Sequence, residues 1–249
     1  MRKYKLSKVI ISSVIIFVFL VIHWIFCNIP IILKSGSVDR LNLFVSLLCD
    51  NGGYEYRQSM MVIYIIPFLL GISYITSYDF SIFNIVRTKS KNRIFNQYLI
   101  NIITWSFLFS FFHEIINIVG MNCVFSNSVI DNNKFILSSL INLFAMTIFY
   151  ARVGMIYWIY KILASEKISL LLTLVTYCIC YYFMFLFPVL GEIGLPCYDC
   201  SLIGGMITDS FTLEIILIKF FKGIMLLIGI LILCLYLWKD KDIFEDERK

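Results

Sequence analysis

Residues 80–100 read FSIFNIVRTKSKNRIFNQYLI, and this stretch determines how the rest of the chain is interpreted. Four cations, Arg87, Lys89, Lys91 and Arg93, fall within seven residues, and strongly apolar sequence lies on both sides of them. Lysine and arginine collect in the cytoplasmic loops of membrane proteins because positive charge resists translocation. The stretch therefore predicts a cytoplasmic loop between two membrane spans.

The composition of the whole chain supports a membrane protein. Hydrophobic residues make up 60% of the 249 residues and charged residues 15%, and the mean hydropathy is +0.88. These values lie well outside the usage of soluble domains. A helix needs about 20 apolar residues to cross a bilayer. The fold class we predict is all-α integral membrane, a single domain of residues 1–249 with six spans: Val9–Leu33, Met60–Ile75, Tyr98–Val119, Phe135–Leu163, Ile168–Leu190 and Ile215–Trp238.

The lysines and arginines of the connecting segments predict the orientation of these spans. One alternating set of segments holds only four of them, Lys34, Arg40, Arg57 and Lys134. The other set holds fourteen and includes both ends of the chain: Arg2, Lys3, Lys5, Lys8, Arg87, Lys89, Lys91, Arg93, Lys161, Lys167, Lys239, Lys241, Arg248 and Lys249. We therefore expect both termini to be cytoplasmic, which agrees with an even number of spans.

The apolar residues that precede the cationic loop have helical spacing. Phe80, Phe83 and Val86 belong to this set, and polar residues fall between its members. The pattern predicts a short amphipathic helix that lies along the membrane interface between the second and third spans. The cations also have a simpler explanation, because they can fix the topology and meet anionic lipid headgroups. The sequence leaves both explanations open.

Three features of the chain resemble the permeases of ABC-2-type transporters, particularly the small permeases of bacteriocin or lantibiotic export and self-immunity in Gram-positive bacteria. They are six spans with both ends inside, the run Arg87-Thr-Lys-Ser-Lys-Asn-Arg93 after the second span, and a loop of about two dozen residues before the last span. The resemblance covers most of the chain. It implies re-entrant helices within Leu195–Lys222 and an ATPase-coupling helix after the second span, with contacts through Phe80, Phe83, Val86, Arg87, Lys89, Lys91 and Arg93.

The function that this resemblance implies is a permease subunit in a bacterial cell membrane, which exports or expels a peptide or another amphipathic substrate. The phosphate-binding run G-x-x-x-x-G-K-[ST] does not occur in the chain. We therefore expect ATP to be bound by a separate ABC ATPase subunit, with no cofactor bound directly. No internal repeat supplies both halves of a transporter, so a second permease copy or a paralogue is also expected.

Four charged residues fall inside the predicted spans, where charge is costly and often functional: Glu114, Arg152, Lys219 and Lys222. At a rise of ~1.5 Å per residue, Glu114 lies about 8 Å from the outer end of its span, and the two lysines lie about 6 and 10 Å from the outer end of theirs. These depths predict an ion pair of Glu114 with Lys219 or Lys222. The alternative is that both lysines extend to the outer headgroups.

Arg152 lies about 16 Å from the cytoplasmic end of its span, which is too deep for it to reach water from a lipid-facing position. We therefore expect it to face the interior of the bundle. There it either contacts a backbone carbonyl as a structural element, which the sequence slightly favours, or lines the path of an anionic or amphipathic substrate.

A membrane-embedded enzyme or an accessory protein without an ATPase is the alternative function. The run His113-Glu114-Ile-Ile-Asn117 falls one residue short of the zinc motif H-E-x-x-H, because Asn117 stands where the second histidine is needed. With only two histidines in the chain, we expect no metal site and no catalytic residues. Cys197-Tyr-Asp-Cys200, in the last outer loop, is expected to form a short disulfide. No segment favours nucleic-acid binding.

Overall fold

The computed structural model describes residues 2–34, 43–44, 47, 62–76, 91–126, 130, 134–186, 202–208 and 211–240, and the elements within them are helices. A bilayer contains no water to satisfy backbone N–H and C=O groups, so an apolar chain crosses it as helices that bond internally. The helices are α1 (Arg2–Lys34), α3 (Ile65–Thr76), α5 (Lys91–Val124), α7 (Phe135–Leu163), α8 (Glu166–Leu186), α10 (Ile203–Ile207) and α11 (Leu213–Asp240).

Five of these helices are long and apolar enough to cross a membrane, namely α1, α5, α7, α8 and α11. They correspond to five of the six predicted spans. The remaining one, Met60–Ile75, is represented by α3, which has 12 residues. At ~1.5 Å per residue α3 is about 18 Å long, little more than half the thickness of the hydrocarbon core. The all-α, multi-pass character is thus confirmed, whereas the described residues contain no sixth full-length span.

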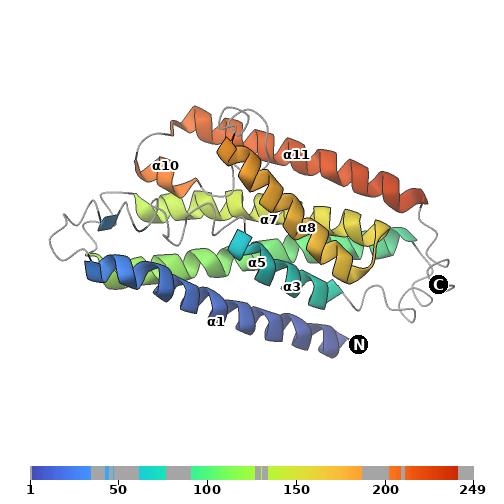
Figure 1. Ribbon diagram of the computed structural model, residues 1–249, viewed down its shortest axis with the longest axis horizontal. Coiled ribbons are helices and arrows are strands. Elements are labelled where there is room, and N and C mark those ends of the chain that lie inside the picture. The colour runs from blue at the N-terminus through green and yellow to red at the C-terminus, as the bar shows by residue number, and fades with distance from the viewer. Residues whose placement is uncertain are drawn as a thin grey trace.

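The helices form an elongated bundle in which α5 and α7 run antiparallel to each other (Figure 1). α1 and α3 pack on α5, and α8 and α11 pack on α7. The beginning of α1 and the end of α11 lie at the same end of the bundle, where α5 also begins (Figure 1). That this end is cytoplasmic stays a prediction from the distribution of lysine and arginine.

α7 is the centre of the bundle. It packs against α3, α5, α8, α10 and α11, and 61% of its most apolar stretch is buried, against 6% for α11. Gly154 allows α5 to approach closely, since a Cβ at this position would lie 2.7 Å from Ile102 Cγ2. Small residues serve this purpose in membrane bundles because close van der Waals packing, not water exclusion, holds the spans together.

A similar close contact holds the short α3 on α5. Trp105 of α5 is 1% exposed, and its indole N–H donates to the backbone carbonyl of Phe68 at 3.1 Å. The indole ring also covers Gly71, where a Cβ would lie 2.1 Å from Trp105 Cζ2. The lack of a side chain at residue 71 is therefore what allows α3 to lie against α5.

We expect Gly71→Ala to destabilise the protein by about 1–3 kcal/mol, because the new methyl group would overlap a buried, hydrogen-bonded indole ring. Gly229→Ala in α11 is the matched control, since nothing lies within 4 Å of a Cβ at that position. Thermal melting followed by size-exclusion chromatography in detergent measures the difference. Equal melting temperatures for the two variants would mean that α3 and α5 do not pack in this way.

Candidate functional site

The face of α5 that points into the bundle is polar over the second half of the helix. Ser106, Ser110, His113, Glu114 and Asn117 share one helical face, and none is more than 3% exposed. Polar groups in the interior of a membrane bundle are costly unless hydrogen bonds offset the loss of their hydration. The partners of these side chains therefore define a candidate functional site.

Asn142 of α7 forms hydrogen bonds with Glu114 of α5 and with Leu202, the residue that precedes α10. Its side chain is fully buried, and its Nδ2 donates to Glu114 Oε1 at 2.5 Å. Its Oδ1 accepts a hydrogen bond from the backbone N–H of Leu202 at 2.7 Å. A single amide side chain thus joins three segments that are distant in the sequence.

α1 contributes the partners on the other side of α5. His23 Nδ1 and the Tyr64 hydroxyl lie 2.9 Å apart in a hydrogen bond whose direction depends on the tautomer of the imidazole. The Tyr64 ring meets the His113 ring edge-on, with 5.0 Å between their centroids. Trp24 donates its indole N–H to Asn117 Oδ1 at 3.4 Å. We refer to the residues that these contacts bring together as the polar cluster: His23, Tyr64, His113, Glu114, Asn117 and Asn142.

The polar cluster has the chemistry of hydrogen bonding and proton exchange. It contains two imidazoles, a phenol and a carboxylate, which can take up or release protons, and two amides, which can only donate and accept hydrogen bonds. Within the described ranges, no three His, Cys, Asp or Glu side chains are grouped so that they could hold a metal ion. The cluster can therefore bind polar groups or pass protons, but a metal-centred reaction has no ligand set in this part of the chain.

A second buried polar feature is Arg152 of α7, whose side chain is 0% exposed. Its three guanidinium nitrogens have no hydrogen-bond partner in the part of the chain that the structure describes. The guanidinium carbon lies 5.8 Å from the centroid of the Phe149 ring, within the range of a cation–π contact. Arg152 thus faces the interior, as the sequence predicts, but the described residues offer it no hydrogen bond to a backbone carbonyl.

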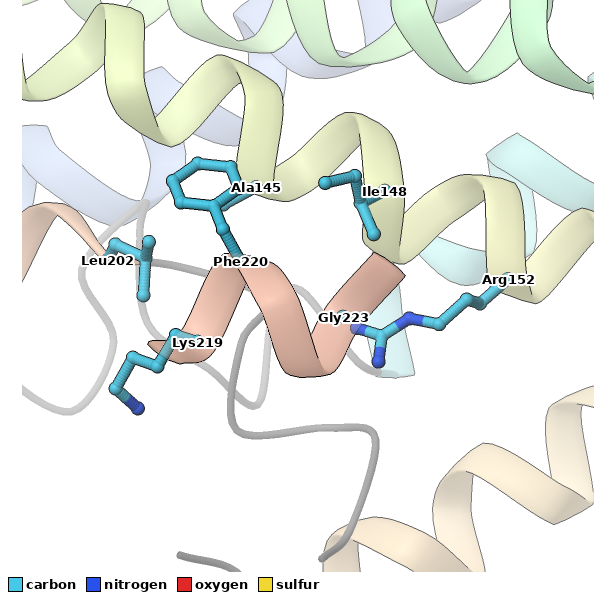
Figure 2. Close-up of a pocket in the computed structure, with 7 residues that line it drawn as sticks. All are labelled: Ala145, Ile148, Arg152, Leu202, Lys219, Phe220 and Gly223. Carbon is cyan, nitrogen blue, oxygen red and sulfur yellow. The ribbon is translucent and has the colours of Figure 1, made fainter. Parts of the chain in front are cut away.

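Arg152 lines a pocket between α7 and α11. The other walls are Ala145, Ile148, Leu202, Lys219, Phe220 and Gly223, and the volume of the pocket is about 10 Å³, about the room that one water molecule needs. Figure 2 shows the arginine reaching from α7 toward α11 beside Gly223, whereas the ammonium group of Lys219 points away from it. The pocket therefore has mostly apolar walls, a guanidinium group on its α7 side and a second cation at its edge.

Leu202 connects this pocket to the polar cluster. Its backbone N–H binds Asn142, and the same residue lines the pocket of Arg152. Asn142 and Arg152 both belong to α7, where they are ten residues apart and thus separated by ~15 Å along the helix. Buried polar groups therefore extend along α7 over about half of the hydrocarbon thickness.

The ion pair of Glu114 with Lys219 or Lys222 stays a prediction. Glu114 accepts its hydrogen bond from Asn142, and the Lys219 ammonium lies 4.8 Å from the centroid of the Phe211 ring. Lys222 is half-buried on the same helix.

The structure describes two of the seven predicted coupling residues. Lys91 and Arg93 form part of the first turn of α5, which is longer at both ends than the predicted span Tyr98–Val119. The others, Phe80, Phe83, Val86, Arg87 and Lys89, lie outside the described residues, as do the predicted interfacial helix and the pair Cys197 and Cys200.

Sequence reasoning missed the partners of the polar residues of α5. Tyr64 and Asn142 belong to no motif. His23 was considered only as one of the two histidines of the chain, which are too few for a zinc site. A signal was present, because an imidazole or an amide inside an apolar span is costly and usually has a partner. His23 and Asn142 both lie in predicted spans, but the sequence does not indicate which residues they meet.

Comparisons of the chain with protein-family models, with curated proteins and with solved structures find no significant match. The function must therefore be argued from the residues and from the geometry of the bundle.

We expect Asn142→Asp to destabilise the protein by about 1–3 kcal/mol, because it replaces the amide that donates to Glu114 with a second carboxyl group. The double variant Glu114→Gln/Asn142→Asp should recover most of this loss. It exchanges the amide and the carboxylate, and it keeps an acceptor for the N–H of Leu202.

Asn122→Asp is the control for this pair of variants. Asn122 lies on α5, as Glu114 does, but it is exposed. Among the described residues its side chain bonds the backbone carbonyl of Ile118 in its own helix. Melting curves in detergent compare the four proteins. A double variant no more stable than Asn142→Asp would argue against the bond between Glu114 and Asn142.

Proposed function

We propose that the chain is a membrane-spanning permease subunit of an ABC transporter, which exports or expels a peptide or another amphipathic substrate with energy from a separate ATPase. The observation that carries the transport part of this proposal is Arg152. It is a fully buried cation whose guanidinium nitrogens have no hydrogen-bond partner among the described residues.

A buried cation with a purely structural role needs hydrogen bonds that offset its desolvation. The penalty for taking an ion out of water is several kcal/mol even after the protein relaxes, and a guanidinium group offers five N–H donors. The cation–π contact with Phe149 offsets only part of this penalty. An anionic group that enters the pocket during transport would engage the remaining donors. Charged residues inside membrane bundles mark substrate paths for this reason.

The polar cluster supports an amphipathic substrate. Its member Asn142 lies on the same helix as Arg152 and bonds the backbone N–H of Leu202, which lines the arginine's pocket. The walls of that pocket are otherwise mostly apolar. A path with apolar walls and separated polar groups suits a molecule that carries both kinds of surface, such as a peptide.

The ABC part of the proposal rests on the sequence. The chain has the cationic run after its second apolar segment that the resemblance requires, and it lacks a nucleotide-binding run of its own. Energy for transport would then come from a separate ATPase that contacts residues 80–93, and a second permease copy or a paralogue would complete the pathway.

A membrane-embedded enzyme or an accessory protein is the second candidate, and the observation that favours it is the hydrogen bond between His23 and Tyr64 beside His113. Histidine and tyrosine are both used for proton transfer in catalysis. Such a protein would work without an ATPase, which makes the two candidates distinguishable.

We expect the tagged chain, extracted from its host in mild detergent, to co-purify with an ABC ATPase and with ATP-hydrolysing activity. The triple variant Phe83→Asp/Arg87→Glu/Lys89→Glu should lose the ATPase, because it disrupts the apolar face and reverses the charge of the predicted coupling helix. Quantitative mass spectrometry of the purified samples measures the ratio of the two proteins.

Lys167→Glu is the control for the triple variant, because it reverses an exposed charge in the first turn of α8, away from that segment. It should keep the ATPase, and all variants should reach the membrane in normal amounts. A chain recovered alone from a well-preserved membrane would contradict the ABC assignment and favour the second candidate.

We expect Arg152→Met to abolish transport without lowering the melting temperature, because it removes a buried charge whose donors make no bonds among the described residues. The variant is introduced into a strain that lacks the gene, and the export or resistance lost on deletion is measured. Lys167→Met removes an exposed cation as the control and should restore the phenotype. A fully active Arg152→Met protein would remove the arginine from the transport path.

A further inference from the structure

A cleft with two lysines lies at the end of the bundle where α5 begins and α11 ends. Its volume is about 480 Å³, which is within the usual range for small-molecule sites. It is lined by Lys91, Asn92, Phe95 and Asn96 of α5 and by Leu235, Trp238 and Lys239 of α11. The described lining residues carry two positive charges and no negative one.

Reciprocal hydrogen bonds hold the two walls of the cleft together. Lys91 Nζ donates to the backbone carbonyl of Lys239 at 2.7 Å, and the indole N–H of Trp238 donates to the backbone carbonyl of Lys91 at 3.3 Å. The Trp238 ring also packs near Phe95 and Trp158, with centroid distances of 6.3 and 5.9 Å. The side chain of Lys91 and the backbone of Lys239 are therefore held by tertiary contacts between the ends of two long helices.

The polar side of the cleft suits a phosphate group. Lys91 and Lys239 provide ammonium donors, and Asn92 and Asn96 provide amide donors. Lys91 is also the first residue of α5, a helix of 34 residues, so the positive end of the helix dipole points to the same place. Helix N-termini with free N–H groups bind phosphate for this reason.

The other side of the cleft suits an acyl chain. Leu235 is 47% exposed on α11, the least buried of the long helices, and it continues the lipid-facing surface of that helix. Trp238 lies between this apolar surface and the lysines. Tryptophan is enriched at the level of the lipid headgroups, because its ring is apolar and its N–H is polar. One side of the cleft is thus apolar and the other cationic, which matches a phospholipid, in which an acyl chain adjoins an anionic phosphate.

We propose that this cleft binds an anionic phospholipid, with the phosphate of the headgroup on Lys91, Lys239 and the two asparagines, and with an acyl chain along Leu235. The proposal is independent of the transport function. The distribution of lysine and arginine in the sequence places the site in the cytoplasmic leaflet.

The test is native mass spectrometry of the full chain, delipidated in detergent and titrated with phosphatidylglycerol or with phosphatidylcholine of the same acyl chains. Phosphatidylglycerol should bind more tightly than phosphatidylcholine. Lys91→Gln/Lys239→Gln should weaken phosphatidylglycerol binding about thirtyfold, if each lysine contributes as it does at an anionic membrane surface. Lys239→Gln alone should weaken phosphatidylglycerol binding about fivefold. This substitution keeps the backbone carbonyl of residue 239, which accepts the hydrogen bond from Lys91.

Arg93→Gln/Lys167→Gln is the matched control, since it removes two exposed cations from the same end of the bundle without touching the cleft. The control should bind phosphatidylglycerol within about twofold of the unmodified chain. If the control loses as much affinity as the lysine variant, general surface charge explains the binding, and the proposal of a specific site is wrong.

Two further outcomes would also overturn the proposal. Equal affinity for phosphatidylglycerol and phosphatidylcholine would mean that the cleft does not select an anionic lipid. Its ligand would then be another anion, such as an acidic side chain of a partner protein. Displacement of phosphatidylglycerol by an equimolar amount of inorganic phosphate would make free phosphate the ligand.

Discussion

A bilayer supplies no hydrogen-bond partners, and this constraint governs how the bundle is built. The backbone satisfies it by forming helices. Some polar side chains in the interior satisfy it by pairing across helices, as Asn142 does with Glu114 of α5 and with the backbone of Leu202. These contacts do more than offset desolvation. They set which face of α5 meets α7, because a rotation of either helix would leave an amide or a carboxylate in hydrocarbon.

Arg152 shares with Asn28 and Ser139 the lack of a hydrogen-bond partner among the described residues, but it also carries a charge, and the transport proposal rests on that difference. The side chain is as buried as Asn142, yet its nitrogens make no hydrogen bond within the described part of the chain. Its neighbours in the pocket are mostly apolar, and Lys219 adds a like charge at the edge. A charge inside a membrane bundle is costly, and under the transport proposal an anionic substrate group would offset that cost. The pocket and the polar cluster are thus two parts of one interior, joined at Leu202.

α11 is held differently from the other long helices. Most of its surface is exposed to the surroundings of the bundle, and its packing within the described residues is chiefly on α7. At its last turn, Trp238 and Lys239 bond to Lys91 at the beginning of α5. The helix is therefore fixed at one end by the residues that form the lysine-lined cleft, and the pocket of Arg152 lies farther along it. Both of the binding sites proposed for this protein use α11.

The sequence by itself determined the class of the protein and the approximate positions of its five long helices. Runs of apolar residues predict spans because hydrocarbon excludes polar groups, and five of these runs are long helices in the structure. The burial of Arg152 also followed from its depth alone. The sequence could not show that, among the described residues, the predicted span Met60–Ile75 contains a helix of only 12 residues, since apolarity reports preference for lipid and not helix length. Only the tertiary structure decided that Asn142 meets Glu114, that Arg152 has no carbonyl partner among the described residues and that Lys91 meets Lys239. Those pairings depend on how helices rotate and approach each other, and small residues such as Gly71 and Gly154 set that approach through contacts with side chains far away in the chain.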